Sequence, residues 1–516
     1  MSLERRAWWI GRILAALLVL VSLRAAYWQL WRGRALDPVA LDAVAAQRTY
    51  AQLSGAPTPV AGSGQVAALV QLPQPVIQRT IELLTSIKRG TVTDRNGNIL
   101  AQDTGEAGHY TRVYADPSLA QTLGYTSALR TGVTGLEATY NQALLGLDRP
   151  DTEIARMLHR PITGSNLTLT IDEQIQQAAY QALGDRPGAV VVIDAKTGAV
   201  LAMASTPTFD PNRINEKGYA SSLTNSALLN RATQGLFTPG SIFKTVTLIA
   251  AVDSHEAGPN TVIDFGKPAS VDANGHTVYT YMVDGGIIYD PNHKDSRLSL
   301  QDSYVYSANV AFAKLANLMS PDTFINYGER LGFSTPDYTK RFPLELPVAE
   351  PQLANDVNSL RTNNLLRANT GYGQGELLTT PLNMAMVVEA VVNNGSIPVP
   401  YFVENIKDPQ GRVIQTRPSN HTVHGIMSAS TAKYVRDAMA ALANHWYPNL
   451  VPGSVIGGKT GTAQLGGEEN PHGWFIGYAT KGDRTLVAVS LLQNAGSGAA
   501  YAVPVWQQVM KVAMGK

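Results

Sequence analysis

Three short motifs in this chain carry residue types that could together form and break an ester on a serine side chain. In chain order they are Ser241 and Lys244, Ser307 and Asn309, and Lys459-Thr460-Gly461-Thr462. A serine hydroxyl is a weak nucleophile at neutral pH, so a neighbouring base must take its proton. Residues three apart on a helix share a face, which would place the amine of Lys244 beside the hydroxyl of Ser241. The motifs therefore predict an acylating serine enzyme.

The surroundings of Ser241 suggest how the base is activated and where the developing negative charge rests. A lysine acts as a base only if desolvation or a second cation lowers its pKa well below the free value. Lys459 is the candidate for that cation. Pro239 and Gly240 indicate a turn that opens a helix, so Ser241 would lie in the first turn among free backbone N–H groups. Those donors would stabilise an oxyanion.

Two other stretches copy parts of these motifs, and ordinary structural roles explain both of them. Ser430 and Lys433 repeat the spacing of the first motif, but Ser428 or Ser430 can cap an amphipathic helix there. Residues 196–198 repeat Lys-Thr-Gly, but they lie between two apolar runs and predict a hairpin turn. We expect neither stretch to take part in the chemistry.

The segment around Ser241 resembles the active-site segment of class B penicillin-binding proteins, which are peptidoglycan D,D-transpeptidases. It reads Asn-Arg-Ala-Thr-Gln-Gly-Leu-Phe-Thr-Pro-Gly-Ser-Ile-Phe-Lys over residues 230–244, and motifs of this kind mark penicillin-binding proteins. Further segments similar to stretches of this family are residues 89–101, 135–141, 170–176 and 373–381. The resemblance extends from Arg89 to the C-terminus. It implies the short form of the family, because too few residues follow the third motif for C-terminal repeat domains.

The resemblance implies an α+β fold. Its penicillin-binding, serine β-lactamase-like transpeptidase domain would be an antiparallel sheet flanked by helices. The expected divisions are a cytoplasmic tail with one transmembrane helix (1–34), a juxtamembrane linker (35–88), a small non-catalytic pedestal (89–160) and the transpeptidase domain (161–516). Periodicity predicts strands at 167–171 and 485–493, a hairpin at 189–205, and helices at 173–183 and 503–514. A helical middle, residues 245–440, would separate the first and last strands of one sheet.

The resemblance also implies how the acylating residues would act. Ser241 would attack the D-Ala-D-Ala carbonyl of a peptidoglycan stem peptide, and Lys244 would take the serine proton. Ser307 would pass a proton to the departing D-alanine. An amine from a second stem peptide would then resolve the ester. β-Lactams would mimic the donor peptide and remain attached to Ser241.

The remaining motif residues would bind the substrate. Asn309 would hold the amide of the donor peptide, and Lys459 and Thr462 would bind its terminal carboxylate, within the segment that also holds Thr460 and Gly461. The backbone N–H groups of Ser241 and Thr462 would form the oxyanion hole. The family further implies a partner, a SEDS-type membrane glycosyltransferase.

The amino-acid composition argues against several other classes of function. The chain has 516 residues and a formal net charge of +1, which gives no reason to expect nucleic-acid binding. It contains no cysteine, so disulfides, thiol catalysis and cysteine-ligated zinc are excluded. The nine histidines show no metal-ligand spacing on an evident helix. We therefore expect neither a metal nor another cofactor.

The N-terminal stretch predicts attachment to the bacterial cytoplasmic membrane. Residues 7–23 are apolar apart from Arg12, and the stretch continues through Trp31, with tryptophans near both of its ends, as at membrane interfaces. A retained single-pass helix is the favoured interpretation, and a cleaved signal peptide is the alternative. The family resemblance places the catalytic domain outside the cytoplasm.

Three other functions share parts of this pattern. A β-lactamase or β-lactam sensor would use the same motifs, and residues 350–355 faintly resemble a loop that supplies a hydrolytic base. A D,D-carboxypeptidase would differ only in resolving the ester with water. A non-catalytic activator of a glycan polymerase would need none of the motifs intact.

Overall fold

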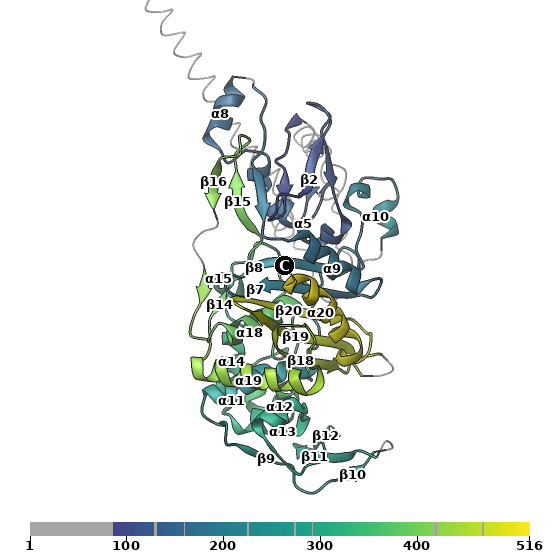
Figure 1. The fold of residues 1–516 in the computed structure, drawn as a ribbon, viewed down its shortest axis with the longest axis vertical. Helices are drawn as coiled ribbons and strands as arrows, with labels where there is room; N and C mark the ends of the chain where they lie inside the picture. Colours follow the sequence, from purple (N-terminus) through teal and green to yellow (C-terminus); the bar gives the residue numbers. More distant parts are fainter. Residues whose placement is uncertain are drawn as a thin grey trace, which may run out of the picture.

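The computed structural model describes residues 86–127, 132–158, 160–223, 226–272, 275–291, 293–416, 421–466 and 469–515. The predicted transmembrane helix and nearly all of the juxtamembrane linker lie outside these ranges. Among the helices described, none is long and apolar enough to cross a membrane. Figure 1 shows a mixed structure with the N-terminal strands at one end, a five-stranded sheet in the centre and small strands at the other end.

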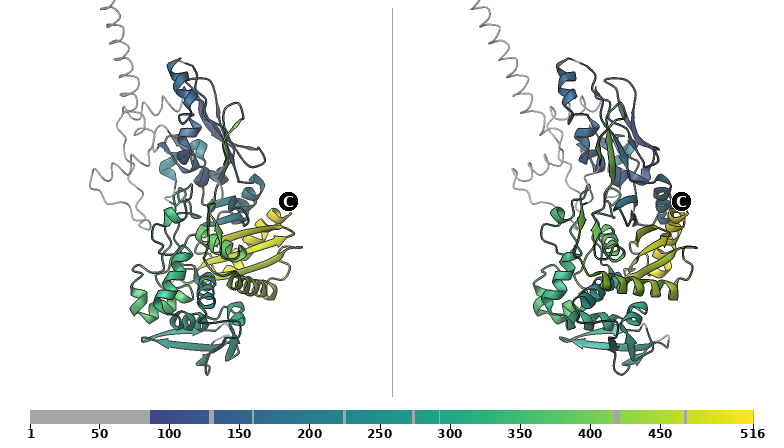
Figure 2. Two further views of the ribbon diagram at one scale, coloured as in Figure 1. Left: turned by 90° about the vertical axis from the view of Figure 1, so that its left-hand side faces the viewer. Right: turned by 60° about the vertical axis from the view of Figure 1, so that its left-hand side comes forward.

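The central sheet is antiparallel and carries helices on both faces. Its strand order is β18 (Val455–Ala463), β19 (His472–Lys481), β20 (Arg484–Leu492), β7 (Gly188–Asp194) and β8 (Ala199–Thr206). One face packs against α9 (Glu173–Leu183) and α20 (Gly498–Met514), and the other against α18 (Pro381–Val392) and α19 (Ala429–Trp446). Figure 2 shows these layers from two further sides. Because both faces are covered, its strands are largely apolar rather than alternating.

Several local predictions are confirmed. The helix predicted at 173–183 is α9, and the Asp172 carboxylate caps it by accepting from two backbone N–H groups. The predicted hairpin is β7 and β8, and Asp194 closes its turn by accepting from the backbone N–H groups of Lys196 and Thr197. Ser428 caps α19, so the second Ser-x-x-Lys spacing belongs to a helix start. The last predicted strand and helix correspond to β20 and α20.

The N-terminal sheet recruits strands from distant parts of the chain. Its order is β16 (Val413–Thr416), β15 (Val403–Lys407), β6 (Asn166–Leu169), β1 (Val92–Thr93), β2 (Ile99–Thr104) and β3 (Thr111–Tyr114). We expected the strand near 167–171 to begin the transpeptidase sheet. It instead pairs in parallel with β1 and antiparallel with β15. The domain boundary near residue 161 stays a prediction.

The expectation of a helical middle is only partly correct, because short strands interrupt it. Its helices are α11 (Lys244–Asp253), α12 (Leu300–Val305), α13 (Asn309–Leu318), α14 (Pro321–Arg330), α15 (Tyr338–Arg341), α16 (Ser359–Thr362) and α17 (Asn364–Gly371), besides α18 and α19. Its strands are β9 (Val262–Asp264), β10 (Ser270–Val271), β11 (Thr277–Val283), β12 (Gly286–Asp290), β13 (Arg297–Ser299), β14 (Ile397–Pro398) and β17 (Thr422–Val423), besides β15 and β16. Strands β10 to β12 form a separate three-stranded sheet.

The remaining elements are short. The N-terminal part contains η2 (Pro117–Leu119), α5 (Ala120–Leu123), β4 (Thr126–Ser127), β5 (Gly132–Val133), α6 (Gly135–Thr139), α7 (Asn141–Leu144) and α8 (Pro150–Met157). Between β8 and α11 lie η3 (Pro211–Arg213), α10 (Tyr219–Ser222) and η4 (Gly240–Phe243).

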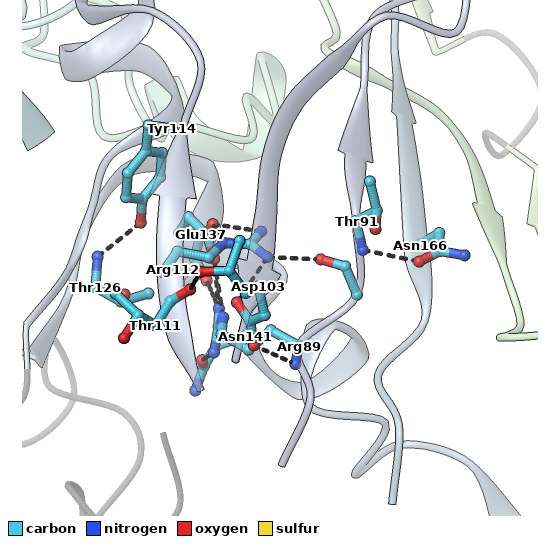
Figure 3. Close-up of polar contacts among 12 residues, drawn as sticks. Arg89, Thr91, Asp103, Thr111, Arg112, Tyr114, Thr126, Glu137, Asn141 and Asn166 are labelled. Atoms are coloured by element: carbon cyan, nitrogen blue, oxygen red, sulfur yellow. Dashed lines mark hydrogen bonds and ion pairs between the residues drawn. The ribbon is translucent and has the colours of Figure 1, made fainter. Parts of the chain in front are cut away.

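A buried ion network holds the N-terminal part together, as Figure 3 shows. The carboxylate of Glu137 lies 2.5 Å from the Arg89 guanidinium and 2.7 Å from that of Arg112. Arg89 also donates to Asn141, and Arg112 lies 3.2 Å from Asp103. Burial alone would raise the pKa of Glu137, but the two arginines outweigh it and hold the pKa below its ordinary value. The network thus joins residues 89–101 to residues 135–141, two of the segments that carry the family resemblance.

Candidate active site

Ser241 lies on the 3-10 turn η4, directly before the buried helix α11. Gly240 has a φ of +58°, which favours glycine. A Cβ on Gly240 would lie 2.8 Å from the carbonyl oxygen of Thr462 on β18. The N–H of Gly240 donates to the carbonyl of Gly373 at 2.9 Å. The turn is therefore pressed against β18, and Ser241 stays partly exposed at the start of a buried helix.

Lys244 brings the first two motifs together. Its amine lies 3.0 Å from Ser241 Oγ and 3.1 Å from Ser307 Oγ. It also donates to the Ser307 carbonyl at 2.5 Å and to Asn309 Oδ1 at 2.7 Å. The amine therefore reaches both the expected nucleophile and the expected proton relay.

The second motif owes its shape to an unusual backbone conformation. Ser307 joins α12 to α13 with a φ of +59°, a conformation that non-glycine residues rarely adopt and that often marks functional sites. Both its carbonyl and its hydroxyl contact Lys244. Asn309 is the first residue of α13, and its Nδ2 donates to the carbonyl of Tyr289 at 3.1 Å. That bond turns the amide oxygen of Asn309 toward Lys244.

The electrostatics of Lys244 suit a base. Its side chain is completely buried. Burial lowers its pKa to about 7, and the Asp290 carboxylate opposes the shift. A substantial fraction of the amine is therefore neutral near pH 7, as proton abstraction requires. The sequence left desolvation and the charge of Lys459 as alternative causes of a low pKa, and burial is the cause of this shift.

Asp290 acts electrostatically on Lys244, and the sequence pattern does not single it out. It ends β12, is fully buried, and accepts from the backbone N–H of Val310 at 3.0 Å. His293 Nε2 lies 3.7 Å from the same carboxylate oxygen. The carboxylate therefore lies at the N-terminus of α13, where the helix dipole favours negative charge. An acidic residue at the end of a half-buried strand is the only signal in the sequence.

The third motif lies along β18, directly beside the serine turn, which is the turn η4 that carries Ser241 together with residues 237–239 before it. A Cβ on Gly461 would lie 2.7 Å from the carbonyl oxygen of Pro239, so only a glycine allows this approach. Thr462 is exposed and its Oγ1 accepts from the backbone N–H of Gly498 at 3.3 Å. Thr460 is partly buried and is hydrogen bonded to Tyr447. All three motifs therefore meet around Ser241.

Lys459, the first residue of the third motif, lies in the protein interior. Its side chain is fully buried and its amine lies 5.5 Å from the centre of the Tyr304 ring. Burial and then the charge of Lys244 hold the pKa of Lys459 well below its ordinary value. The Tyr304 hydroxyl lies 2.8 Å from Thr245 Oγ1, on the turn after Lys244. The two lysines are thus electrostatically coupled.

The other candidate residues lie on the surface of the molecule. Ser430 and Lys433 are both exposed on α19, and Lys433 pairs with Asp437 at 2.6 Å. Glu350, which begins the segment that faintly resembles a hydrolytic loop, is also exposed. Within the described ranges, no group of histidine and carboxylate side chains could hold a metal ion.

Two family models match the chain. The penicillin binding protein transpeptidase domain matches residues 188–511, and the penicillin binding protein A dimerisation domain matches residues 89–168. The first of these matches covers more than half of the chain and includes all three motifs.

Individual relatives agree with the family models. The peptidoglycan D,D-transpeptidase PbpA of Mycolicibacterium smegmatis is 29% identical over 460 residues, which is 83% of this chain and 89% of that protein. The ceftriaxone acyl-enzyme complex of penicillin-binding protein A from M. tuberculosis aligns with a TM-score of 0.72 and 27% identity, over 84% of this chain and all of that one. The D,D-transpeptidase domain of a peptidoglycan glycosyltransferase from Eggerthella lenta gives a TM-score of 0.71 and 28% identity, over 83% of this chain and 99% of that one. The motifs, the fold and these matches together identify the chain as a member of the penicillin-binding protein transpeptidase family.

Proposed function

We propose that this protein is a serine D,D-transpeptidase that cross-links peptidoglycan stem peptides through an acyl-enzyme on Ser241. The observation that carries the proposal is the position of the Lys244 amine. It lies 3.0 Å from Ser241 Oγ, it is fully buried, and its pKa of about 7 lets it accept a proton at neutral pH. A serine and a base in hydrogen-bonding contact are what nucleophilic catalysis requires.

Acylation would proceed in two stages, attack by Ser241 and departure of the terminal D-alanine. Ser241 Oγ attacks the carbonyl carbon of the D-Ala-D-Ala bond while its proton moves to Lys244. The resulting oxyanion receives hydrogen bonds from the backbone N–H groups of Ser241 and Thr462. The proton then passes through the hydroxyl of Ser307, 3.1 Å from the lysine amine, to the nitrogen of the departing D-alanine. The C–N bond breaks and an ester remains on Ser241.

The ester would be resolved by an amine of a second stem peptide. The nitrogen attacks the ester carbonyl and its proton passes through the same relay to Lys244. As the ester C–O bond breaks, Lys244 returns a proton to Ser241 Oγ, and the free serine and the neutral lysine are regenerated. Water in place of the amine would make the enzyme a carboxypeptidase. β-Lactams would acylate Ser241 in the first step, and their ring-opened product would keep its amine attached and remain in the site.

The substrate carboxylate would bind beside the third motif. The low pKa of Lys459 reflects its burial and the neighbouring Lys244. A carboxylate entering this site would offset both effects and favour the charged ammonium. The exposed hydroxyl of Thr462 and the partly buried hydroxyl of Thr460 add donors along the same strand. The Nδ2 of Asn309 would hold the donor amide after exchanging its bond to Tyr289.

The enzyme would be anchored in the membrane and would work with a membrane partner. The apolar residues 7–23 would anchor the chain in the bacterial cytoplasmic membrane as a single-pass protein with the catalytic domain outside. A SEDS-type glycosyltransferase would be its membrane partner, and would supply the glycan strands whose peptides are cross-linked. Co-purification from detergent extracts, with and without residues 1–34, tests both statements.

Covalent labelling tests the catalytic assignment. Ser241→Ala should abolish labelling by a fluorescent penicillin, and mass spectrometry of the wild-type adduct should place it on the peptide that contains Ser241. Ser430→Ala is the matched control, because it alters the same Ser-x-x-Lys spacing on the exposed face of α19. Undiminished labelling of a folded Ser241→Ala protein would remove Ser241 as the nucleophile.

A further inference from the structure

Trp474 is a buried side chain that touches the serine turn from the neighbouring strand. It lies on β19 opposite Gly461 of the third motif and is fully buried. Its indole N–H donates to the carbonyl of Thr238 at 3.0 Å, three residues before the nucleophile. We propose that Trp474 is a positioning residue for acylation, which uses this hydrogen bond to fix the turn that carries Ser241 against the strand that carries Thr462. The inference rests on the proposed function.

Hydrogen bonds hold the segment 237–241, which leads into η4 and carries Ser241, at successive positions. Phe237 exchanges two backbone hydrogen bonds with Thr379, each 2.9 Å long, and Gly240 donates to Gly373 at 2.9 Å. Between these two anchors, Thr238 is held by Trp474. The outer anchors are hydrogen bonds between backbone groups. The central anchor comes from a side chain, and only tryptophan carries an indole N–H.

The two proposed oxyanion donors lie on different elements, and Trp474 links the two in addition to their direct packing. The N–H of Ser241 belongs to the turn, and the N–H of Thr462 belongs to β18. The ladder between β18 and β19 fixes Thr462 relative to Trp474, and the indole bond fixes the turn relative to Trp474. The spacing of the two donors therefore depends on this side chain. Oxyanion donors act only within a narrow range of distances from the developing charge.

The packing around the turn shows how tightly this spacing is set. A Cβ on Gly461 would lie 2.7 Å from the Pro239 carbonyl oxygen and 3.1 Å from the Trp474 Cβ. The Phe237 ring packs edge-on against Trp474, with ring centres 6.3 Å apart. The turn therefore cannot approach β18 more closely. Loss of the indole bond leaves it free only to move away, which would widen the oxyanion hole.

Trp474→Phe removes the donor and keeps an aromatic ring in the interior. Single-turnover acylation by a chromogenic cephalosporin separates the limiting rate constant from the half-saturating concentration. We expect the limiting rate constant to fall at least tenfold, roughly 1.4 kcal/mol of lost transition-state stabilisation. The half-saturating concentration should change less than about threefold, because the carboxylate-binding groups are retained.

Trp506→Phe is the matched control. Trp506 is also buried, and its indole N–H donates to the carbonyl of Ala488 at 2.9 Å on the face of the sheet that packs against α20. It therefore loses the same atoms and the same type of bond, and should acylate within about twofold of the wild-type rate. Equal rate losses in the two variants would show a general effect of core damage and would overturn the inference.

A closer replacement covers the case in which Trp474→Phe does not fold. 3-Benzothienylalanine in place of Trp474 keeps the bicyclic shape and substitutes sulfur for the N–H group. Acylation of this protein at the wild-type rate would overturn the inference, and a tenfold fall would support it. A wild-type protein that takes no label on Ser241 would instead refute the proposed function, so the two failures are distinguishable.

Discussion

The charge of Asp290 should set the pH at which the enzyme acylates. Its carboxylate raises the pKa of Lys244 against the effect of burial. Asp290→Asn removes the negative charge and keeps an oxygen that can accept from the Val310 N–H. We therefore expect the acidic limb of the acylation profile to move to lower pH in this variant.

The size of the pH effect follows from the pKa of Lys244. With a pKa of about 7, the neutral fraction of the amine rises from about one-eleventh at pH 6 to about ten-elevenths at pH 8. Wild-type acylation should therefore increase about tenfold over this interval and reach half its plateau near pH 7. In Asp290→Asn the midpoint should lie below that of the wild type, so the variant loses less of its plateau rate at pH 6.

Other charged and titratable groups around Lys244 can also affect the pH midpoint of acylation. Lys459 on β18 is coupled to Lys244, and His293 lies beside Asp290. A fall in plateau rate alone would reflect displaced hydrogen bonds around Asn309, whereas a shift of the midpoint reports charge. Stopped-flow acylation from pH 5 to pH 9 separates the two. Asp264→Asn, a change at an exposed carboxylate of the same region, should leave the midpoint unchanged. A midpoint that stays fixed or rises in Asp290→Asn would refute the electrostatic argument.

Two further changes test other parts of the structure. Glu137→Gln leaves the buried guanidiniums of Arg89 and Arg112 without their shared carboxylate, so the free energy of unfolding in urea should fall by about 3–5 kcal/mol; an unchanged denaturation midpoint would contradict this role. Because the folded pKa of Glu137 is lowered, its stabilisation is present above the unfolded pKa and is lost as the pH falls through the folded pKa. Gly461→Ala would bring a Cβ within 2.7 Å of the Pro239 carbonyl oxygen and should reduce penicillin acylation at least tenfold; labelling at the wild-type rate would show that β18 can retreat without loss.

Much of the local structure could be predicted because it depends on nearby residues. Asp172 and Ser428 mark helix starts, and the turn at Asp194 closes a hairpin, through contacts within a few residues. The contact between Ser241 and Lys244 is of the same kind, since their spacing alone places both side chains on one face. Strand partners were harder to predict. β15 and β16 join the N-terminal sheet although more than two hundred residues separate them from β6, and such pairing leaves no local signal.

The sequence by itself determined which chemical groups are available, their order, and the family to which those motifs point. Only the tertiary structure decided that Ser307 adopts a left-handed conformation toward Lys244, that Asp290 opposes the effect of burial on that lysine, and that Trp474 reaches the serine turn. The reason is physical. Residue spacing along a helix fixes neighbours within a turn, whereas burial, charge coupling and close backbone approach arise from segments that meet only when the whole chain has packed.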